Sequence, residues 1–344
     1  MGRNLLGALL CAGLVCSARQ ANAKVWRVPE NVATIQAAVS AAQDGDQIWV
    51  GPGAYCGATI DKRVELVGIG QPRIIGCSSG PSVGVARVGF FMPGADGKNP
   101  ANGTQIWGFV FDGRGVSSAN LAPLSFGIFA RFAREIVISH NEFEGTAQAI
   151  TNTAGDRWLI AHNRITGLTV LDCTGPCTGG DGIVIQLARA PLAVPGGDSA
   201  PINRPEDNLV LDNTIEGSPP DGFADFGMAG ILVLAADHTT LLKNTLRLPH
   251  NPAAPALGQG ILLTNTCCGD STSHLPGIRY AILALNDGRD SELAIMLEGS
   301  GGTNTRGLFL FRNRGVQQIE GVERLVAFSL LTVVAPPPRA QPQQ

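Results

Sequence analysis

The sequence has few charged residues and no long apolar run beyond its first residues. Asp, Glu, Lys and Arg together make up 15% of the 344 residues, and the formal net charge is −3 at pH 7. This charge balance gives no electrostatic basis for binding nucleic acid or anionic lipid. Beyond residue 23 no apolar run approaches the ~20 residues that a membrane-spanning helix needs, so we expect no membrane insertion.

Glycine, in contrast, is abundant, with 44 residues, and 44% of the chain is apolar. Many short strands joined by tight turns require such a composition. A chain of this length can form one domain if its strands stack as a solenoid. The tail at 336–344 is rich in proline and is expected to be disordered or extended.

The first 23 residues have the pattern of a secretory signal peptide. A single Arg precedes the apolar run LLGALLCAGLVCSA, and the small-x-small segment ANA lies directly before Lys24. The apolar run is too short to anchor the chain in a membrane. We therefore expect a secreted or periplasmic protein whose folded domain spans residues 24–335.

The most informative pattern is a set of asparagines at repeating positions. In three units an Ile lies 13 residues before the Asn, and in two others, ending at Asn213 and Asn286, the distance is 30 and 25 residues. A short unit that repeats in register, with insertions at fixed points, is typical of a solenoid. The several short Val/Ile-rich runs in each unit predict a parallel β-helix rather than a helical repeat. The main Asn positions are Asn141, Asn163, Asn213, Asn244 and Asn313.

The segment ahead of the first repeats carries a second pattern. Residues 35–43 predict a short amphipathic helix with Thr34 as its N-cap. The stretches TIQAAV, IWV, PGAY and VELVGIG within residues 25–77 resemble the N-terminal cap and first coil of right-handed parallel β-helix proteins of the pectin-lyase-like superfamily. The resemblance implies an all-β fold, a right-handed parallel β-helix solenoid whose open first coil is covered by this short helix.

Six cysteines remain beyond the signal peptide. Cys56 and Cys77 are 21 residues apart, close to one coil. Stacked rungs lie ~4.8 Å apart, which suits a disulfide, so we predict this bridge. The other four cysteines are expected to form disulfides, either within each of their two loops or between the two loops. The alternative is a zinc site with four thiolate ligands, which export of the protein disfavours. These four are Cys173 and Cys177 in one loop, and Cys267 and Cys268 in another.

The insertions predict where a functional site would lie. In the family that the chain resembles, each coil has three strands, and here the repeated Asn marks the turn between the second and third. The insertions then fall on both sides of the first strand and would wall a groove along one sheet. The resembling pectate-degrading enzymes place their catalytic groove at this sheet. The insertions are 168–180, 217–228 and 249–259 before the first strand, and 188–207 and 265–277 after it.

The chemistry of a uronic-acid polymer indicates which residues to look for at this groove. β-Elimination or epimerisation needs a base for the proton alpha to the carboxylate and a cation for the enolate-like charge that forms. Enzymes of the resembling family commonly use Arg or Lys as the base and Asp-bound Ca²⁺ as the electrophile. The candidate Ca²⁺ ligands are Asp181, Asp221 and Asp225, with His250 nearby, and the candidate bases are Arg189 and Arg204. The alternative for Asp181 and Asp221 is an Asp-Gly turn.

Alternation along the first strand weakens the case for an enzyme. With Ile128 and its equivalents pointing inward, one outward row is mostly apolar, and the next, which includes Arg131, Thr153 and Gln186, carries few charges. Either loops cover the apolar row or it contacts a ligand or partner. The motifs of pectin methylesterases, polygalacturonases and alginate epimerases are missing. The apolar row is Phe129, Thr151, Val184, Leu232, Leu262 and Met296.

Two functions therefore stay open. The first is a carbohydrate-active enzyme, a lyase or epimerase of acidic polysaccharides. The second is a non-catalytic exported β-helix protein that binds glycan or another surface component. Bound Ca²⁺ would favour the first, and a continuous uncovered apolar row would favour the second.

Overall fold

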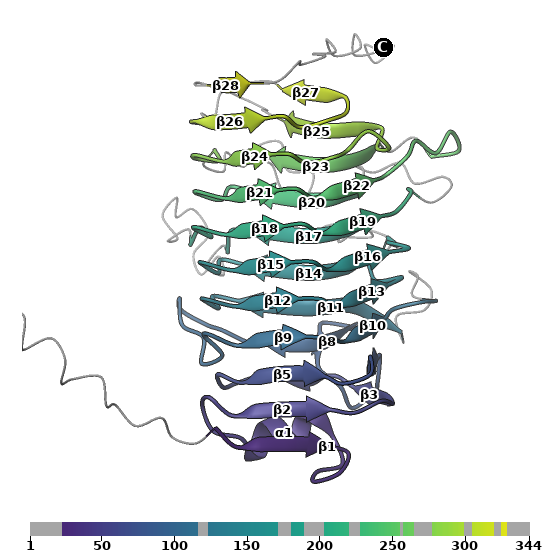
Figure 1. Ribbon diagram of the computed structural model, residues 1–344, viewed down its shortest axis with the longest axis vertical. Helices are drawn as coiled ribbons and strands as arrows, with labels where there is room; N and C mark the ends of the chain where they lie inside the picture. Colours follow the sequence, from purple (N-terminus) through teal and green to yellow (C-terminus); the bar gives the residue numbers. More distant parts are fainter. Residues whose placement is uncertain are drawn as a thin grey trace, which may run out of the picture.

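The computed structural model describes residues 23–115, 123–170, 180–188, 203–219, 228–254, 257–264, 277–298, 305–319 and 325–328. Within these ranges the chain forms three sheets of parallel strands and one helix, stacked coil upon coil from the β1 end to the β28 end (Figure 1). The parallel β-helix predicted from the repeat is confirmed. The described residues contain no helix that is both long enough and apolar enough to span a membrane.

Sheets A, B and C, as we name them, hold eleven, seven and ten strands within the described ranges. Sheet A contains β1 (Val25–Val28), β2 (Gln47–Val50), β5 (Glu65–Gly68), β9 (Gln105–Trp107), β12 (Val137–Ser139), β15 (Leu159–Ala161), β18 (Leu209–Leu211), β21 (Thr240–Leu242), β24 (Ile282–Ala284), β26 (Leu308–Phe311) and β28 (Leu325–Phe328). Sheet B contains β3 (Ala54–Cys56), β6 (Arg73–Ile75), β10 (Val110–Asp112), β13 (Glu142–Glu144), β16 (Arg164–Thr166), β19 (Thr214–Glu216) and β22 (Thr245–Arg247). Sheet C contains β4 (Ala58–Thr59), β8 (Ala86–Met92), β11 (Leu124–Arg131), β14 (Gln148–Thr153), β17 (Asp181–Gln186), β20 (Met228–Leu234), β23 (Gly258–Thr264), β25 (Leu293–Glu298) and β27 (Gln317–Ile319), and β7 (Ser82–Val83) pairs antiparallel with β8.

Each coil runs from sheet C to sheet A, then to sheet B and back to sheet C, as β11, β12, β13 and β14 do. The small residue before each inward Ile has a structural reason. A Cβ on Gly127 would lie 2.5 Å from the Ala149 carbonyl oxygen and 2.5 Å from the ring of Phe143, so the backbone passes too close for a side chain. The predicted inward orientation is confirmed, because the six Ile side chains are at most 1% exposed. They are Ile128, Ile150, Ile183, Ile231, Ile261 and Ile295.

The helix α1 spans Ile35–Ala41 and ends two residues before the predicted boundary. Thr34 accepts a hydrogen bond at its side chain from the Ala37 N–H at 3.1 Å, as its predicted N-cap role requires. Lys62 Nζ donates to three carbonyl oxygens at the other end of the helix, at 2.8 to 3.0 Å. The helix packs against β1, β2 and β4. Strand β1, which precedes the helix and joins sheet A, was not predicted.

The repeated asparagines form a continuous ladder at the turn from sheet A to sheet B. Each Asn Nδ2 donates to the Oδ1 of the next, at 3.2, 3.0, 3.0, 3.0 and 2.9 Å along the series. The same oxygens accept backbone N–H groups, and the side chains are at most 6% exposed. The residue before each Asn adopts a left-handed conformation, with φ between 50° and 58°, which makes the turn tight. The series is Asn141, Asn163, Asn213, Asn244, Asn286 and Asn313.

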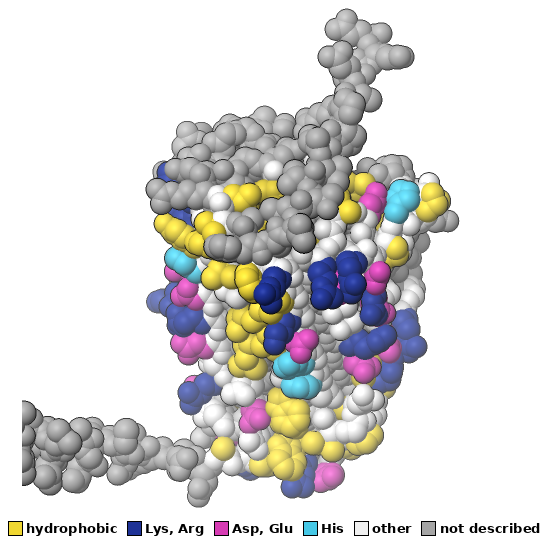
Figure 2. Space-filling model, turned by 45° about the horizontal axis from the view of Figure 1, so that its top comes forward, with side chains coloured by type: hydrophobic (Ala, Val, Ile, Leu, Met, Phe, Trp, Pro, Cys, Tyr) yellow, Lys and Arg dark blue, Asp and Glu magenta, His cyan; other side chains and the backbone are white. Residues whose placement is uncertain are grey.

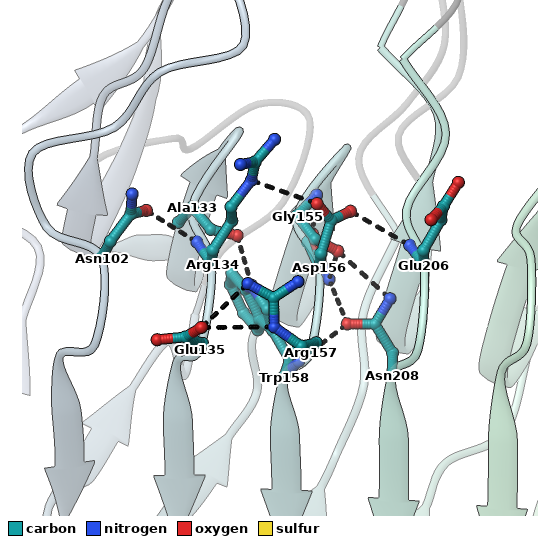
Figure 3. A network of polar contacts seen from close by, with 11 residues as sticks. Asn102, Ala133, Arg134, Glu135, Gly155, Asp156, Arg157, Trp158, Glu206 and Asn208 are labelled. Atoms are coloured by element: carbon teal, nitrogen blue, oxygen red, sulfur yellow. Dashed lines mark hydrogen bonds and ion pairs between the residues drawn. The ribbon is translucent and has the colours of Figure 1, made fainter.

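The turn from sheet C to sheet A carries a second polar network (Figure 3). Arg134 pairs with Asp156 at 3.1 Å, and Arg157 pairs with Glu135 at 2.8 Å. Deeper in the turn, Asn208 Oδ1 accepts bonds from the side chain of the previous coil's Asn and from a backbone N–H. The charged side chains of this corner therefore compensate one another between neighbouring coils.

The predicted disulfide is confirmed. Cys56, on β3, is bonded to Cys77, which follows the neighbouring strand β6, and their Cα atoms are 5.5 Å apart. The other four cysteines, Cys173, Cys177, Cys267 and Cys268, lie outside the described residues, as do residues 1–22 of the predicted signal peptide and the tail. Their pairing, and the zinc alternative, stay open.

Candidate functional site

The predicted insertions border sheet C on both of its edges. Three lie between a strand of sheet B and the next strand of sheet C: β16 to β17, β19 to β20, and β22 to β23. Two lie between a strand of sheet C and the next strand of sheet A: β17 to β18, and β23 to β24. Most of their residues lie outside the described ranges. The strands themselves confirm that the insertions flank the sheet that was expected.

A cavity of about 360 Å³ lies on the outer face of sheet C. Neighbouring strands supply its floor through outward-facing side chains. Phe91 comes from β8, Phe129 and Arg131 from β11, Thr153 from β14 and Gln186 from β17. Ser82, Val83, Leu187 and Ala188 complete the lining. The pairing register places Arg131, Thr153 and Gln186 side by side in one row.

One side of the cavity is aromatic. The rings of Phe91 and Phe129 have centroids 6.0 Å apart and are tilted by 58°. Phe126 meets Phe129 edge-on at 5.6 Å, and together with Val88 these rings form an apolar cluster separate from the main core. Phe91 and Phe129 are only partly buried, so their faces can pack against the C–H groups of a ligand.

The opposite side of the cavity is polar. Arg131 has a buried Nε that finds no hydrogen-bond partner among the residues that the structure describes. Its guanidinium lies 5.7 Å from the ring of Phe132. Gln186 Nε2 donates to Thr153 Oγ1 at 3.1 Å, which orients the amide toward the residue that lies between Gln186 and Arg131 in the row. An arginine is charged at every physiological pH and its planar fork matches a carboxylate. The cavity therefore combines an anion-binding group with hydroxyl and amide groups and two aromatic rings.

The apolar row expected on this face follows one register line across sheet C. Thr151 and Val184, in its middle, are fully buried. Phe129, Leu232 and Leu262 are only partly buried. The row is thus covered over part of its length rather than exposed throughout.

Asp181 begins β17, as predicted, and is 8% exposed. Its Oδ1 accepts a hydrogen bond from the Ala229 N–H at 3.3 Å. This hydrogen bond joins Asp181 to the neighbouring strand β20. The alternative interpretation, an Asp-Gly turn, expected a hydrogen bond to the local backbone. Burial raises the pKa of Asp181 to about 8, and the Ala229 bond offsets this only in part. This shift favours the protonated carboxyl near pH 7.

The other predicted site residues are not brought together with Asp181 in the described part of the chain. His250 Nδ1 lies 3.1 Å from Glu292 Oε1 on the surface. Arg204 is 11% exposed, pairs with Asp237 and donates to the Gly277 carbonyl oxygen at 2.6 Å. Arg204 is not among the residues that line the cavity, and its role as a base stays a prediction.

Asp221, Asp225 and Arg189 lie outside the described residues, so their predicted roles stay predictions. Within the described ranges no group of three or more His, Cys, Asp or Glu side chains is placed to hold a metal ion. The Ca²⁺ site also stays a prediction, because two of its three expected ligands are not described. Sequence analysis placed Arg131, Thr153 and Gln186 on this face without assigning them a role, and it missed Phe91.

No protein-family model matches the sequence, and comparison with curated proteins finds no match. Solved structures do resemble it. The surface adhesin PfbA of Streptococcus pneumoniae is 14% identical, with a TM-score of 0.52 over 85% of this chain and 78% of that chain. An alginate lyase from Paenibacillus sp. is 12% identical, with a TM-score of 0.44 over 88% and 99%. The A-module of a mannuronan C-5 epimerase from Azotobacter vinelandii is 15% identical, with a TM-score of 0.29 over 87% and 93%. At these identities the likeness is one of fold alone, and the chain is a parallel β-helix protein.

Proposed function

We propose that this is an exported, carbohydrate-active β-helix protein that holds an acidic polysaccharide against the outer face of sheet C. The observation that carries the proposal is that Arg131 lines the cavity in one row with Thr153 and Gln186. This arrangement places one guanidinium beside hydroxyl and amide groups. A ligand carboxylate would accept hydrogen bonds from the guanidinium and neutralise its charge.

The remaining lining fits a sugar that carries such a carboxylate. The faces of Phe91 and Phe129 would pack against the apolar face of the sugar ring. Thr153 and Gln186 would exchange hydrogen bonds with its hydroxyl groups. In this arrangement the carboxylate sets the orientation of the ring, and the neighbouring sugars would extend along the row of coils.

Catalysis by β-elimination or epimerisation is the second candidate, and the position of Arg131 favours it. Removal of the proton alpha to a carboxylate builds charge on the carboxylate oxygens, and a guanidinium bound to them would stabilise that charge. The missing component is a base. Arg189, one of the two predicted bases, directly follows Ala188 of the cavity lining in the sequence. Ca²⁺ bound by Asp181, Asp221 and Asp225 would be a separate source of positive charge, since Asp181 begins β17 and the cavity lies at the other end of that strand.

A screen on polyuronates tests the two candidates together. Purified protein would be run through native gels containing polygalacturonate or alginate, with a neutral glucan as the control polymer. Reaction mixtures with the same polymers would be followed by the absorbance of unsaturated product, with and without Ca²⁺.

Retardation by an acidic polymer without unsaturated product supports binding alone, and formation of unsaturated product supports a lyase. An epimerase would change the uronate composition of alginate, read by NMR, without forming unsaturated ends. A protein that neither binds nor changes any acidic polymer would contradict the proposal.

A further inference from the structure

A second surface with features of a ligand site lies on the outer face of sheet A, at its N-terminal end. Trp49 of β2 and Trp107 of β9 stand in one register column, with Val67 of β5 between them. Two rungs separate the two tryptophans, which corresponds to roughly 9.6 Å along the solenoid. We call the surface formed by these two rings and the polar column beside them, Gln47, Glu65 and Gln105, the indole face.

The two indole groups are held in place by one hydrogen-bonded chain. Trp49 Nε1 donates to Gln47 Oε1 at 3.2 Å, and Gln47 Nε2 donates to Glu65 Oε2 at 2.7 Å. The other carboxylate oxygen of Glu65 accepts the Nε1–H of Trp107 at 3.2 Å. Because one Glu–Gln pair orients both rings, their positions are fixed before any ligand arrives.

The burial of Val67 shows how the rings lie. Its neighbour Leu66 points into the core, so alternation places Val67 on the outer face, yet it is only 2% exposed. Its partners in the column are the two tryptophans, whose large side chains can account for this burial. Trp107 is nevertheless 37% exposed. Trp107 is thus the more open of the two rings, while Trp49 is partly buried beside the Arg27 guanidinium.

The indole face carries one negative charge, on Glu65, whose hydrogen-bond donors are both neutral. Both oxygens of Glu65 are already used by Gln47 and Trp107. Arg27, at the edge of the face, lies 5.2 Å from the Trp49 ring and 3.8 Å from Glu30. On this side of the molecule hydrophobic side chains form a band over sheet A, and most charged side chains gather on either side of it (Figure 2).

We infer that the indole face binds an extended, neutral, β-linked polysaccharide. Two rungs of the sheet match the length of one disaccharide in such a chain, whose alternate sugars present the same face to a flat surface. Each exposed indole would then stack on every second sugar. Gln105 and the free positions of Gln47 would bond to hydroxyl groups at the edge of the chain. Charge complementarity favours a neutral polymer, since the face offers no cation without a nearby acidic partner among the residues named above.

This inference does not depend on the function proposed for sheet C. Sheets A and C are different faces of the coil, and the cavity lining contains no residue of the indole face. Binding to one surface can therefore fail while binding to the other succeeds, and separate variants report on each.

The test is binding of the full chain to microcrystalline cellulose, with starch granules, whose α-linked chain is coiled, as the comparison. We expect binding to cellulose, weakened roughly tenfold or more by Trp107→Ala and by Trp49→Ala. Trp107→Phe should keep most of the affinity because it keeps an aromatic face. Phe309→Ala, on the same face of sheet A but in a distant coil, is the matched control and should bind as the wild type does.

A measurement on the unmodified chain covers the case in which an alanine variant fails to fold. Cellohexaose should reduce the quenching of tryptophan fluorescence by acrylamide, because the bound sugar shields the exposed indole rings. Absence of both cellulose binding and this protection would overturn the inference. Equal binding by the wild type and both folded alanine variants would overturn it as well, since the rings would then serve only to cover Val67.

Discussion

Asn163 donates its Nδ2 hydrogen to Asn213 Oδ1 at 3.0 Å, although 50 residues separate the two in the chain. The neighbouring step, from Asn141 to Asn163, spans only 22 residues and has nearly the same geometry, at 3.2 Å. The additional residues are accommodated at the edges of sheet C, and the turn that carries the ladder keeps its form in the described coils from Asn141 to Asn313. The ladder therefore fixes the register of the coils independently of insertion length.

The first prediction concerns this ladder. Asn213→Ala removes the acceptor of both the Asn163 side chain and the Asn163 backbone N–H. The Asn163 backbone N–H is then left unpaired, whereas Asn163 Nδ2 keeps the Ile138 and Ala161 carbonyl oxygens as acceptors, so we expect a loss of about 1–3 kcal/mol in the free energy of unfolding. Urea denaturation measures it. Asn31→Ala, which removes one exposed hydrogen bond, is the control and should change stability by no more than about 0.5 kcal/mol.

The disulfide gives the second prediction. Cys56 and Cys77 close a loop with a sequence separation of 21, and restricting such a loop in the unfolded chain stabilises the fold by about 3 kcal/mol. The variant Cys56→Ser with Cys77→Ser should lose about this amount in urea denaturation. Peptide mapping of the exported wild-type protein without reductant should recover the two cysteines linked. Recovery of either as a free thiol would contradict the pairing.

The third prediction is a pH dependence due to Asp181. Burial raises its pKa in the folded state to about 8, above the usual value of 3.8 for an aspartate. Between these two values the folded state keeps a proton that the unfolded state has lost, so stability falls as pH rises from about 4 to about 8. Asp181→Asn should remove this part of the fall. Thermal unfolding across this pH range is the measurement.

The same experiment bears on the predicted Ca²⁺ site. If Asp181 is a ligand, Ca²⁺ should raise the unfolding temperature of the wild type at pH 8 and should have a much smaller effect on Asp181→Asn. Asp221→Ala with Asp225→Ala should likewise lose the effect, and calorimetry should show loss of Ca²⁺ binding. A wild type that binds no Ca²⁺ would remove the metal from the proposed chemistry.

The features that sequence analysis predicted are those that repeat in register. The inward Ile residues and the ladder asparagines recur in coil after coil, and a period that survives insertions is visible in one chain. The cavity has no such period. Phe91, Arg131 and Gln186 come from three different coils, and only the pairing register shows that they are neighbours.

Arg204 illustrates a second reason why site residues are difficult to predict. Its sequence position, in a long insertion beside sheet C, agreed with a role at the groove. The structure pairs it with Asp237, which follows a different strand, and with a carbonyl oxygen at Gly277, and its role at the groove stays a prediction. A contact between three separate coils leaves no local pattern in the sequence.

The last prediction tests Arg131 against a matched arginine. Arg131→Gln keeps much of the side-chain volume and removes the charge, so we expect affinity for an acidic polysaccharide to fall roughly tenfold or more. Arg131→Lys should fall in between, because it keeps the charge and loses the planar fork. Arg157→Gln is the control, since Arg157 lies at the corner between sheets C and A and pairs with Glu135 (Figure 3). Affinity electrophoresis at several salt concentrations measures all three variants.

Loss of the carboxylate contact should also flatten the salt dependence of binding, which a general loss of folding would not do. Equal effects of the Arg131 and Arg157 substitutions would show that net charge, rather than the cavity, holds the polymer.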